Sequence, residues 1–297
     1  MLRATAGSGL ELERASLLDI EVLRSQLDTQ FFGVGDRLIY LPVVDSTNTL
    51  AVQLAHERPD EGVVILTDSQ TKGRGRQGRR WVDVSGCNVL ASTLLRPLFP
   101  PHLLVMLASL AVVAAIAETC GVSTSIKWPN DILFADSKVA GILIETGHDL
   151  SGRLIAVVGI GMNVNGHIEE LAAYLDLQAP LGATATTLEA ACGHRVTRET
   201  LIAHLLRHSE TEYLALQREF QDASSVSQGT SGPISRLLRE RWRSQLSTLG
   251  RTIEVHQGET VISGVAEDVN DNGELLLRRH SGKLVTITWG DVGYPVE

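Results

Sequence analysis

Residues 71–81 read TKGRGRQGRRW, a stretch that combines alternating glycines with a cluster of positive charge. Five of the nine residues 72–80 are cationic, whereas the 297-residue chain has a formal net charge of −9. Arginine binds phosphate or carboxylate through two hydrogen bonds, and glycine lets the backbone approach a ligand closely. The pattern therefore predicts a mobile loop that closes over an anion. A general nucleic-acid-binding surface is disfavoured by the acidic remainder of the chain.

Other motifs fit this stretch less well. The GxGxxG spacing from Gly73 to Gly78 matches a dinucleotide-binding fingerprint, which requires a helix directly afterwards. Residues 79–88 read RRWVDVSGCN and carry no apolar stripe at helical spacing. A Walker A loop occurs nowhere in the chain. A disordered Arg-Gly segment is disfavoured because strand-like residues flank the loop, at 62–67 and 88–95. A solvated basic hairpin remains an open alternative.

The rest of the chain predicts an α+β fold. Further strands are expected at residues 38–44, 138–145 and 154–163, with a short strand ending at Lys127. A helix capped by Asp45 or Ser46 is expected to run to about residue 57. Residues 103–117 are apolar throughout, but fifteen residues fall short of the roughly 20 that a membrane span needs. They are therefore predicted to form a buried helix that ends near Gly121.

Several weaker segments complete this prediction. Residues 10–30 are interpreted as one amphipathic helix, 168–175 and 187–191 as short helical pieces, and 198–220 and 234–246 as longer helices. Residues 222–232, DASSVSQGTSG, are interpreted as a flexible polar linker. From residue 250 onwards, short strand-like runs alternate with turn residues, and Asn272 and Gly273 form a strong hairpin signal. A small SH3-like barrel is therefore expected at the C-terminus.

The composition indicates a cytoplasmic protein. The three cysteines, Cys87, Cys120 and Cys192, are far apart, and no Cys/His spacing indicates a metal site. No apolar segment follows the first residues, so neither a signal peptide nor a membrane anchor is expected.

Several motifs, in this order, resemble those of biotin protein ligases. They are VDSTN at 44–48, SQTKGRGRQGR at 69–79, KWPNDI at 127–132, KVAGILIE at 138–145, GIGMNVN at 159–165 and WGDV at 289–292. The resemblance covers roughly residues 38–297. It implies a mixed sheet of the class II synthetase type with helices, followed by the barrel. The expected domains are an N-terminal helical extension at 1–37, a catalytic biotin- and ATP-binding domain at 38–249, and the barrel at 250–297.

The resemblance also implies a two-step reaction that uses ATP, biotin and Mg²⁺. The biotin carboxylate attacks the α-phosphorus of ATP, which gives biotinyl-5′-AMP and pyrophosphate. A lysine amine of a biotin carboxyl carrier protein or domain then attacks the acyl carbon, and AMP leaves. A lipoate ligase or related acyltransferase on the same fold is the alternative. A nucleic-acid-binding module built on the arginines is a further one.

The matched positions imply the following roles. Lys127 and Arg76 are expected to be catalytic, and no residue is expected to bind a metal directly. The expected biotin contacts are Ser46, Thr47, Gln70, Arg74, Arg76 and Lys127. The expected nucleotide contacts are Arg74, Arg76, Arg79, Trp81, Asn130, Lys138 and Asn163. Asp131 is left with two possible roles, orienting Lys127 or assisting the incoming amine.

Larger members of the family carry an N-terminal DNA-binding domain. Here residues 1–37 supply one predicted helix, and a winged helix needs about sixty residues to build its own core. The acidic side chains of this segment also outnumber its arginines. We therefore expect a ligase that does not bind operator DNA, as a monomer or a homodimer.

Overall fold

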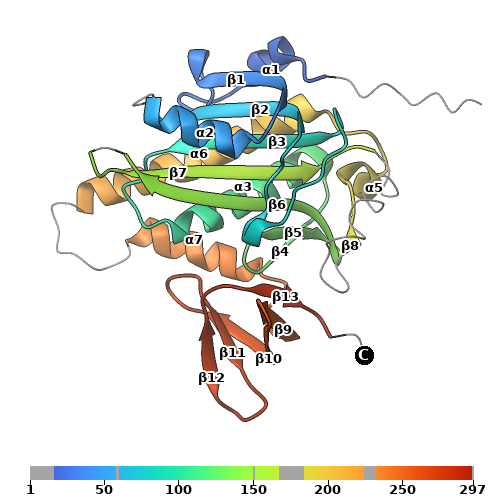
Figure 1. Ribbon diagram of the computed structural model, residues 1–297, viewed down its shortest axis with the longest axis vertical. Helices are drawn as coiled ribbons and strands as arrows, with labels where there is room; N and C mark the ends of the chain where they lie inside the picture. Colours follow the sequence, from blue (N-terminus) through green and yellow to red (C-terminus); the bar gives the residue numbers. More distant parts are fainter. Residues whose placement is uncertain (1–16, 58–59, 150, 167–183, 224–231, 296–297) are drawn as a thin grey trace, which may run out of the picture.

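The computed structural model describes residues 17–57, 60–149, 151–166, 184–223 and 232–295. Within these residues the chain forms an eight-stranded mixed sheet and a five-stranded antiparallel sheet. The smaller sheet lies at one end of the molecule, next to the last helix of the larger unit (Figure 1). The α+β class expected from the sequence is therefore confirmed.

The large sheet is mixed because its first pair of strands and the pair that involves its shortest strand are parallel. Helix α2 (Thr47–Glu57) connects β1 to β2, which run parallel, and the neighbouring strands from β2 to β4 pair antiparallel. In spatial order the main path of the sheet comprises β1 (Leu38–Val44), β2 (Val63–Gln70), β3 (Asn88–Leu95), β7 (Leu154–Asn163), β6 (Ser137–His148), β5 (Asp131–Phe134) and β4 (Ser125–Lys127). A short strand, β8 (Thr184–Ala185), pairs with the start of β6. The predicted strands at 38–44, 88–95 and 154–163 are confirmed at their predicted bounds.

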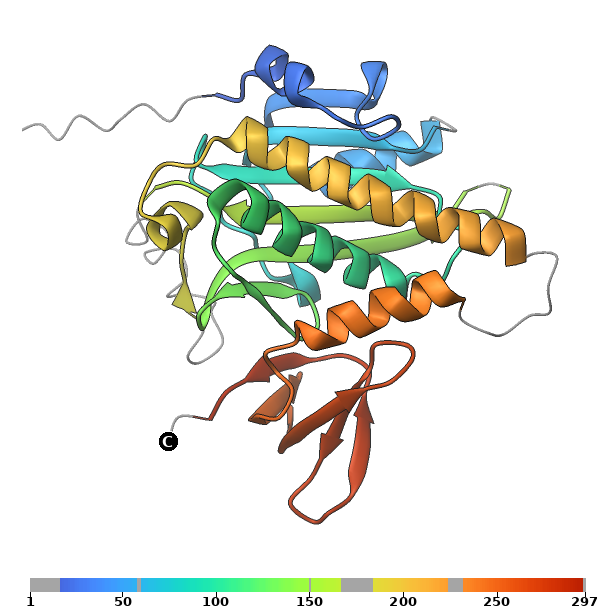
Figure 2. The same cartoon turned by 180° about the vertical axis from the view of Figure 1, so that it is seen from behind.

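Three helices cover one face of this sheet. They are α3 (His102–Cys120), α6 (Arg198–Ala223) and α7 (Pro233–Ser244), which lie side by side in Figure 2. Helix α3 is long and apolar enough to cross a membrane, but eleven of its nineteen residues are buried inside the molecule. It is therefore the core helix that the sequence predicts, and it ends where Gly121 adopts a left-handed conformation with φ 68°.

The opposite face of the sheet is only partly covered. Helix α2 packs on it through a small apolar cluster that consists of Ala51, Ala55, Val63, Ile65, Leu94, Ile155 and Val157. The segment that contains residues 71–81 crosses this face over β3, β7 and β6 (Figure 1). A cleft is therefore left between this segment and the sheet.

The small sheet begins directly after α7. Its strands are β9 (Thr252–Gln257), β10 (Thr260–Val269), β11 (Leu275–Arg278), β12 (Leu284–Ile287) and β13 (Asp291–Gly293). The turn predicted at residues 272–273 connects β10 and β11. Asn270 accepts the backbone N–H groups of Asn272 and Glu274, and Gly273 has φ 75°. β13 folds back on β9, so the WGDV segment lies on the side that faces the large sheet.

The helix predicted for residues 10–30 is too long: within its described part, residues 17–30, only the middle is helical. Helix α1 covers only Ile20–Gln26, because Asp19 caps it by accepting the N–H groups of Glu21 and Val22. Beyond it, the carboxylate of Glu210 binds the N–H groups of residues 30, 31 and 32 at 2.8, 2.7 and 2.6 Å. These backbone groups are therefore not available for a continued helix.

Other predictions differ in extent or lie outside the described residues. The short helix α5 spans Leu188–Cys192, one residue later than expected. Helix α6 continues through Asp222 and Ala223, which the sequence analysis assigned to the linker. Residues 224–231 of that linker, the predicted helix at 168–175 and residues 10–16 are not described by the structure.

Candidate functional site

A single cleft contains every site residue that the sequence analysis named. Its walls come from the start of α2, the end of β2, residues 74–82, the β4–β5 turn, β6, β7 and the WGDV segment. The residues brought together are Ser46, Thr47, Gln70, Arg74, Arg76, Arg79, Trp81, Lys127, Asn130, Lys138 and Asn163. These positions are up to 117 residues apart in the sequence, so their convergence on one cavity supports a common role.

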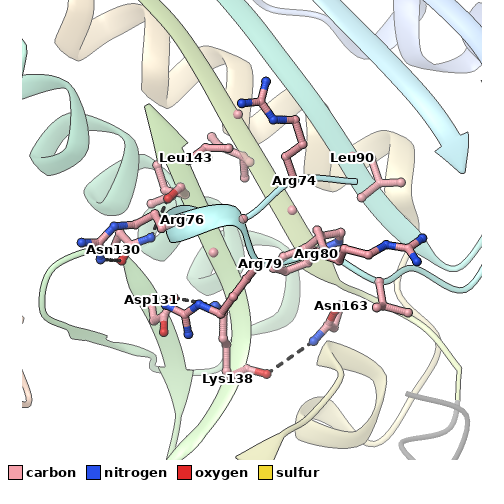
Figure 3. Close-up of a pocket in the computed structure, with 18 of the residues that line it drawn as sticks. Arg74, Arg76, Arg79, Arg80, Leu90, Asn130, Asp131, Lys138, Leu143 and Asn163 are labelled. Atoms are coloured by element: carbon pink, nitrogen blue, oxygen red, sulfur yellow. Dashed lines mark hydrogen bonds and ion pairs between the residues drawn. The ribbon is translucent and has the colours of Figure 1, made fainter. Parts of the chain in front are cut away.

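Residues 71–81, which we call the glycine-arginine loop, form a tight hairpin. Gly75 N donates to Arg79 O at 2.8 Å, and Trp81 N donates to Gly73 O at 3.1 Å. At the tip, Gln77 has φ 55°, an uncommon conformation for a residue other than glycine. The arginines of the loop extend in different directions, as the close-up of Figure 3 shows.

Each arginine of the loop that faces the cleft has a protein partner. Arg76 Nη1 donates to Asn130 Oδ1 at 2.8 Å, and Arg76 Nη2 lies 3.5 Å from Gly290 O. Arg79 forms an ion pair with Asp291. These contacts connect the loop to the β4–β5 turn and to the small sheet. The small sheet therefore contributes directly to the cleft, a role that the sequence analysis did not assign to it.

Two lysines lie on the same side of the cleft. Lys138 Nζ forms an ion pair with Asp131 at 2.6 Å and lies 5.6 Å from the centre of the Trp81 ring. Lys127 Nζ lies 5.1 Å from the ring centre of Tyr294. Burial lowers the pKa of Lys127 from its ordinary value, and the nearby Asp131 partly opposes this change. The carboxylate of Asp131 binds Lys138, which the sequence analysis had not considered.

Burial also affects Arg76. It lowers the pKa of the Arg76 guanidinium, and the carboxylates of Asp291 and Asp131 oppose this shift.

We call the group formed by Arg76, Arg79, Lys127, Asp131, Lys138 and Asp291 the charged end of the cleft. Over the whole cleft, six cationic residues face two acidic ones, Asp131 and Asp291. Positive charge is therefore concentrated in this cleft, although the whole protein has a net charge of −9.

The other end of the cleft is polar but uncharged. We call Ser46, Thr47, Asn48 and Gln70 the neutral end. Gln70 Oε1 accepts hydrogen bonds from Thr47 N at 2.9 Å and from Thr47 Oγ1 at 3.2 Å. Ser46 Oγ lies 3.5 Å from Thr49 N and caps α2, whereas the carboxylate of Asp45, the other predicted cap, binds Thr71 and Lys72. The hydroxyls and amides at this helix start suit a neutral ligand with both donors and acceptors.

The floor of the cleft is made of glycine where the loop approaches it. A Cβ atom added to Gly161 of β7 would lie 2.5 Å from Cε2 of Trp81, a distance that no side chain tolerates. The ring of Trp81 therefore packs directly against the strand, and its buried Nε1 has no hydrogen-bond partner within the described residues. Asn163, at the end of the same strand, is 4% exposed and belongs to the cleft wall.

Comparison with known proteins identifies the family that shares this architecture. Residues 40–165 match the biotin/lipoate A/B protein ligase family, and residues 248–292 match the biotin protein ligase C-terminal domain. The chain is 31% identical to the biotin–[acetyl-CoA-carboxylase] ligase of Paracoccus denitrificans, over 81% of this chain and 94% of that protein. It belongs to the biotin protein ligase family.

Two further relatives support this family assignment. The bifunctional ligase/repressor BirA of Bacillus subtilis (strain 168) is 34% identical over 84% of this chain and 71% of its own length. Among solved structures, the biotin protein ligase from Aquifex aeolicus in complex with biotin and ATP has a TM-score of 0.64 and 28% identity, over 86% of this chain and 97% of that one. The expected mixed sheet and SH3-like C-terminal barrel are thus those of biotin protein ligases.

Sequence reasoning missed several residues that line the cleft or bind the residues that do. Asn48, Glu145, Gly290 and Asp291 all lie within motifs that were recognised, but no chemical role had been derived for them. Their partners are distant in the sequence: Asp291 binds a residue 212 positions away, and Glu145 binds one 97 positions away. Such pairs become visible only when the fold brings the strands together.

Proposed function

We propose that this protein activates biotin as biotinyl-5′-AMP and transfers the biotinyl group to a lysine of a biotin carboxyl carrier protein. The observation that carries the proposal is the division of one cleft into a neutral and a charged end. Biotin has a neutral ring system and a carboxylate, and ATP is a polyanion. A lipoate ligase is the weaker alternative, because the barrel matches the C-terminal domain of biotin protein ligases.

In the first step, an oxygen of the biotin carboxylate attacks the α-phosphorus, and the bond to the leaving pyrophosphate breaks. Both reactants are anions, so fixed positive charge is needed to offset their repulsion. We propose that Lys138 and Lys127 supply it, Lys138 beside Trp81 and Lys127 beside Tyr294. We propose that Asp131 orients Lys138 and that Arg76 and Arg79 bind the phosphates, after exchanging their protein partners for phosphate oxygens.

We propose that the biotin ring binds at the neutral end, against Ser46, Thr47 and Gln70. The glycine-arginine loop, including Arg74, then covers it. On the nucleotide side, Trp81, Asn130 and Asn163 are proposed to border the adenylate. A loop that encloses the mixed anhydride protects it from water until the carrier lysine arrives.

In the second step, the amine of the carrier lysine attacks the acyl carbon and forms an amide, and the bond to AMP breaks. Magnesium is expected to enter with ATP and to neutralise phosphate charge. Within the described residues no group of three acidic, histidine or cysteine side chains could hold a metal, and Asp131 and Asp291 are paired with cations.

We also propose that residues 38–249 and 250–297 act as one catalytic unit, because the loop arginines bind both. The N-terminal extension, residues 1–37, is proposed to support the catalytic domain without binding operator DNA. A gel shift at low salt with upstream DNA, with and without biotin and ATP, tests this point. A specific, ligand-dependent shift would contradict it.

The direct test of the proposed function is incubation with biotin, ATP and a purified carboxyl carrier domain. The expected result is a mass increase of the carrier by one biotinyl group and the release of pyrophosphate and AMP. Lipoate should not replace biotin. If neither acid is transferred while the carrier is modified by a known biotin ligase in parallel, the proposed function is wrong.

A further inference from the structure

Glu145 connects the glycine-arginine loop to the neutral end of the cleft. It lies on β6, and each of its carboxylate oxygens has a different partner. Oε1 forms an ion pair with Arg74 Nη2 at 2.8 Å, and Oε2 accepts a hydrogen bond from Asn48 Nδ2 at 2.9 Å. One carboxylate therefore joins the loop to the first turn of α2.

From Asn48 the connection continues to the neutral end. Asn48 is 4% exposed, and its Oδ1 accepts a hydrogen bond from Ser92 Oγ at 2.6 Å. The same Ser92 Oγ lies 2.7 Å from Thr47 Oγ1, and Thr47 binds Gln70. A continuous chain of polar contacts therefore links Glu145 to the side chains proposed to bind the biotin ring.

The amide of Asn48 has little room to take another position. It lies against Gly159 of β7, where an added Cβ atom would come within 2.1 Å of Asn48 Oδ1. Because the amide is packed in this way and bonded at both ends, its orientation depends on its two partners. A change at Glu145 therefore alters the polar contacts of the neutral end.

Arg74 differs from the other arginines of the loop. In Figure 3 its side chain extends away from Lys138 and Asp131, whereas Arg76 and Arg79 lie on their side of the cleft. Its partner, Glu145, neutralises its charge. The pair is partly exposed, with side-chain exposures of 48% and 23%, and pairs of this kind contribute little to fold stability. The pair connects the loop to β6.

We propose that Glu145 is a positioning residue for biotin. Through Arg74 it holds the loop over the neutral end, and through Asn48 it orients the hydroxyl and amide groups that bind the ring. This inference rests on the proposed function, since it requires biotin to occupy that end. Glu145 does not touch the reacting atoms, so its loss should weaken biotin binding and leave ATP binding unchanged.

The test compares Glu145→Gln with wild type. The amide keeps a hydrogen-bond acceptor but removes the charge that holds Arg74. The variant should raise KM for biotin about fivefold, the upper range for one partly exposed ion pair, while KM for ATP stays within about twofold. Calorimetric titration with biotin alone should show the same loss of affinity. Glu267→Gln is the matched control, because Glu267 forms a similar exposed ion pair with Arg278 in the small sheet.

A second variant tests whether Glu145 acts through the loop. The double variant Arg74→Gln/Glu145→Gln should weaken biotin binding less than the sum of the two single effects. The reason is that each single change already removes the same contact, the ion pair between Arg74 and Glu145. Additive effects, an unchanged KM for biotin in Glu145→Gln, or an equal rise in both KM values would overturn the inference. Inactive wild-type protein would instead disprove the proposed function, whereas active wild type with a neutral Glu145→Gln disproves only the positioning role.

Discussion

The two ends of the cleft differ in the kind of partner that their polar groups have. The neutral end has hydroxyl and amide groups that are already bonded to one another, so a ligand is met by a fixed pattern of donors and acceptors. At the charged end, Arg79 and Lys138 are held by Asp291 and Asp131, and an anion has to replace those carboxylates. We therefore expect recognition at the neutral end to depend on shape and hydrogen bonds. At the charged end we expect it to depend on an exchange of charge partners.

The largest effect is expected when a positive charge is removed from the charged end of the cleft. Lys138→Ala and Lys127→Ala should each slow pyrophosphate release by about a hundredfold or more, because a fixed cation between two anions lowers the barrier by several kcal/mol. Single-turnover assays with saturating biotin and ATP measure this effect. Lys283→Ala, at an exposed position of the small sheet, is the control. A rate within about twofold of wild type for either cleft variant would remove that lysine from the mechanism.

The neutral end should respond in a different parameter. Thr47→Val keeps the shape of the side chain but removes the hydroxyl that binds Gln70 and Ser92. We expect KM for biotin to rise by about tenfold, since an unpaired buried polar group costs about 1–3 kcal/mol, with little change in kcat. Steady-state kinetics with varied biotin measure it, with Thr260→Val as the control. A fall in kcat at unchanged KM would contradict the proposed difference between the two ends.

A smaller effect concerns pH. Burial disfavours the charged form of Lys127 and lowers its pKa below the ordinary 10.5, so this side chain loses its proton earlier as the pH rises. The rate of adenylation should therefore decline on the alkaline side below that value. Lys127→Arg stays protonated, because arginine titrates above about 12. The variant should therefore move the decline in rate to higher pH, and at alkaline pH it should retain a few-fold more of its rate than wild type. Superimposable profiles between pH 7 and 10 would show that the charge of Lys127 is not required.

The smallest expected effect is on the loop itself. Its arginines have protein partners, so ligand binding should reinforce an existing position rather than create one. Biotin with ATP should slow tryptic cleavage after Arg74, Arg76 and Arg79 by about threefold or more, since ligand binding lowers the population of open loop. Cleavage in the remote segment around Arg218 serves as the internal control. Equal cleavage of the loop with and without ligands would speak against closure.

How far the sequence predicts this molecule depends on the range of the interactions. Strands β1, β3 and β7 follow from local apolar patterns, and the cleft residues follow from short motifs. The N-terminal helix was predicted too long because Glu210, about 180 residues away, binds the backbone of residues 30–32. The contact of Arg79 with Asp291 is equally distant. Interactions of this kind depend on the assembled fold, and local periodicity carries no sign of them.

Helix α3 has a consequence for the synthesis of the chain. It is apolar on almost every side, and the helices that cover it, α6 and α7, follow later in the sequence. About 100 residues separate the end of α3 from the end of α6, so a ribosome adding about 5–20 residues per second leaves it uncovered for roughly 5–20 seconds. During that interval the nascent chain exposes a segment with the hydrophobicity of a membrane span.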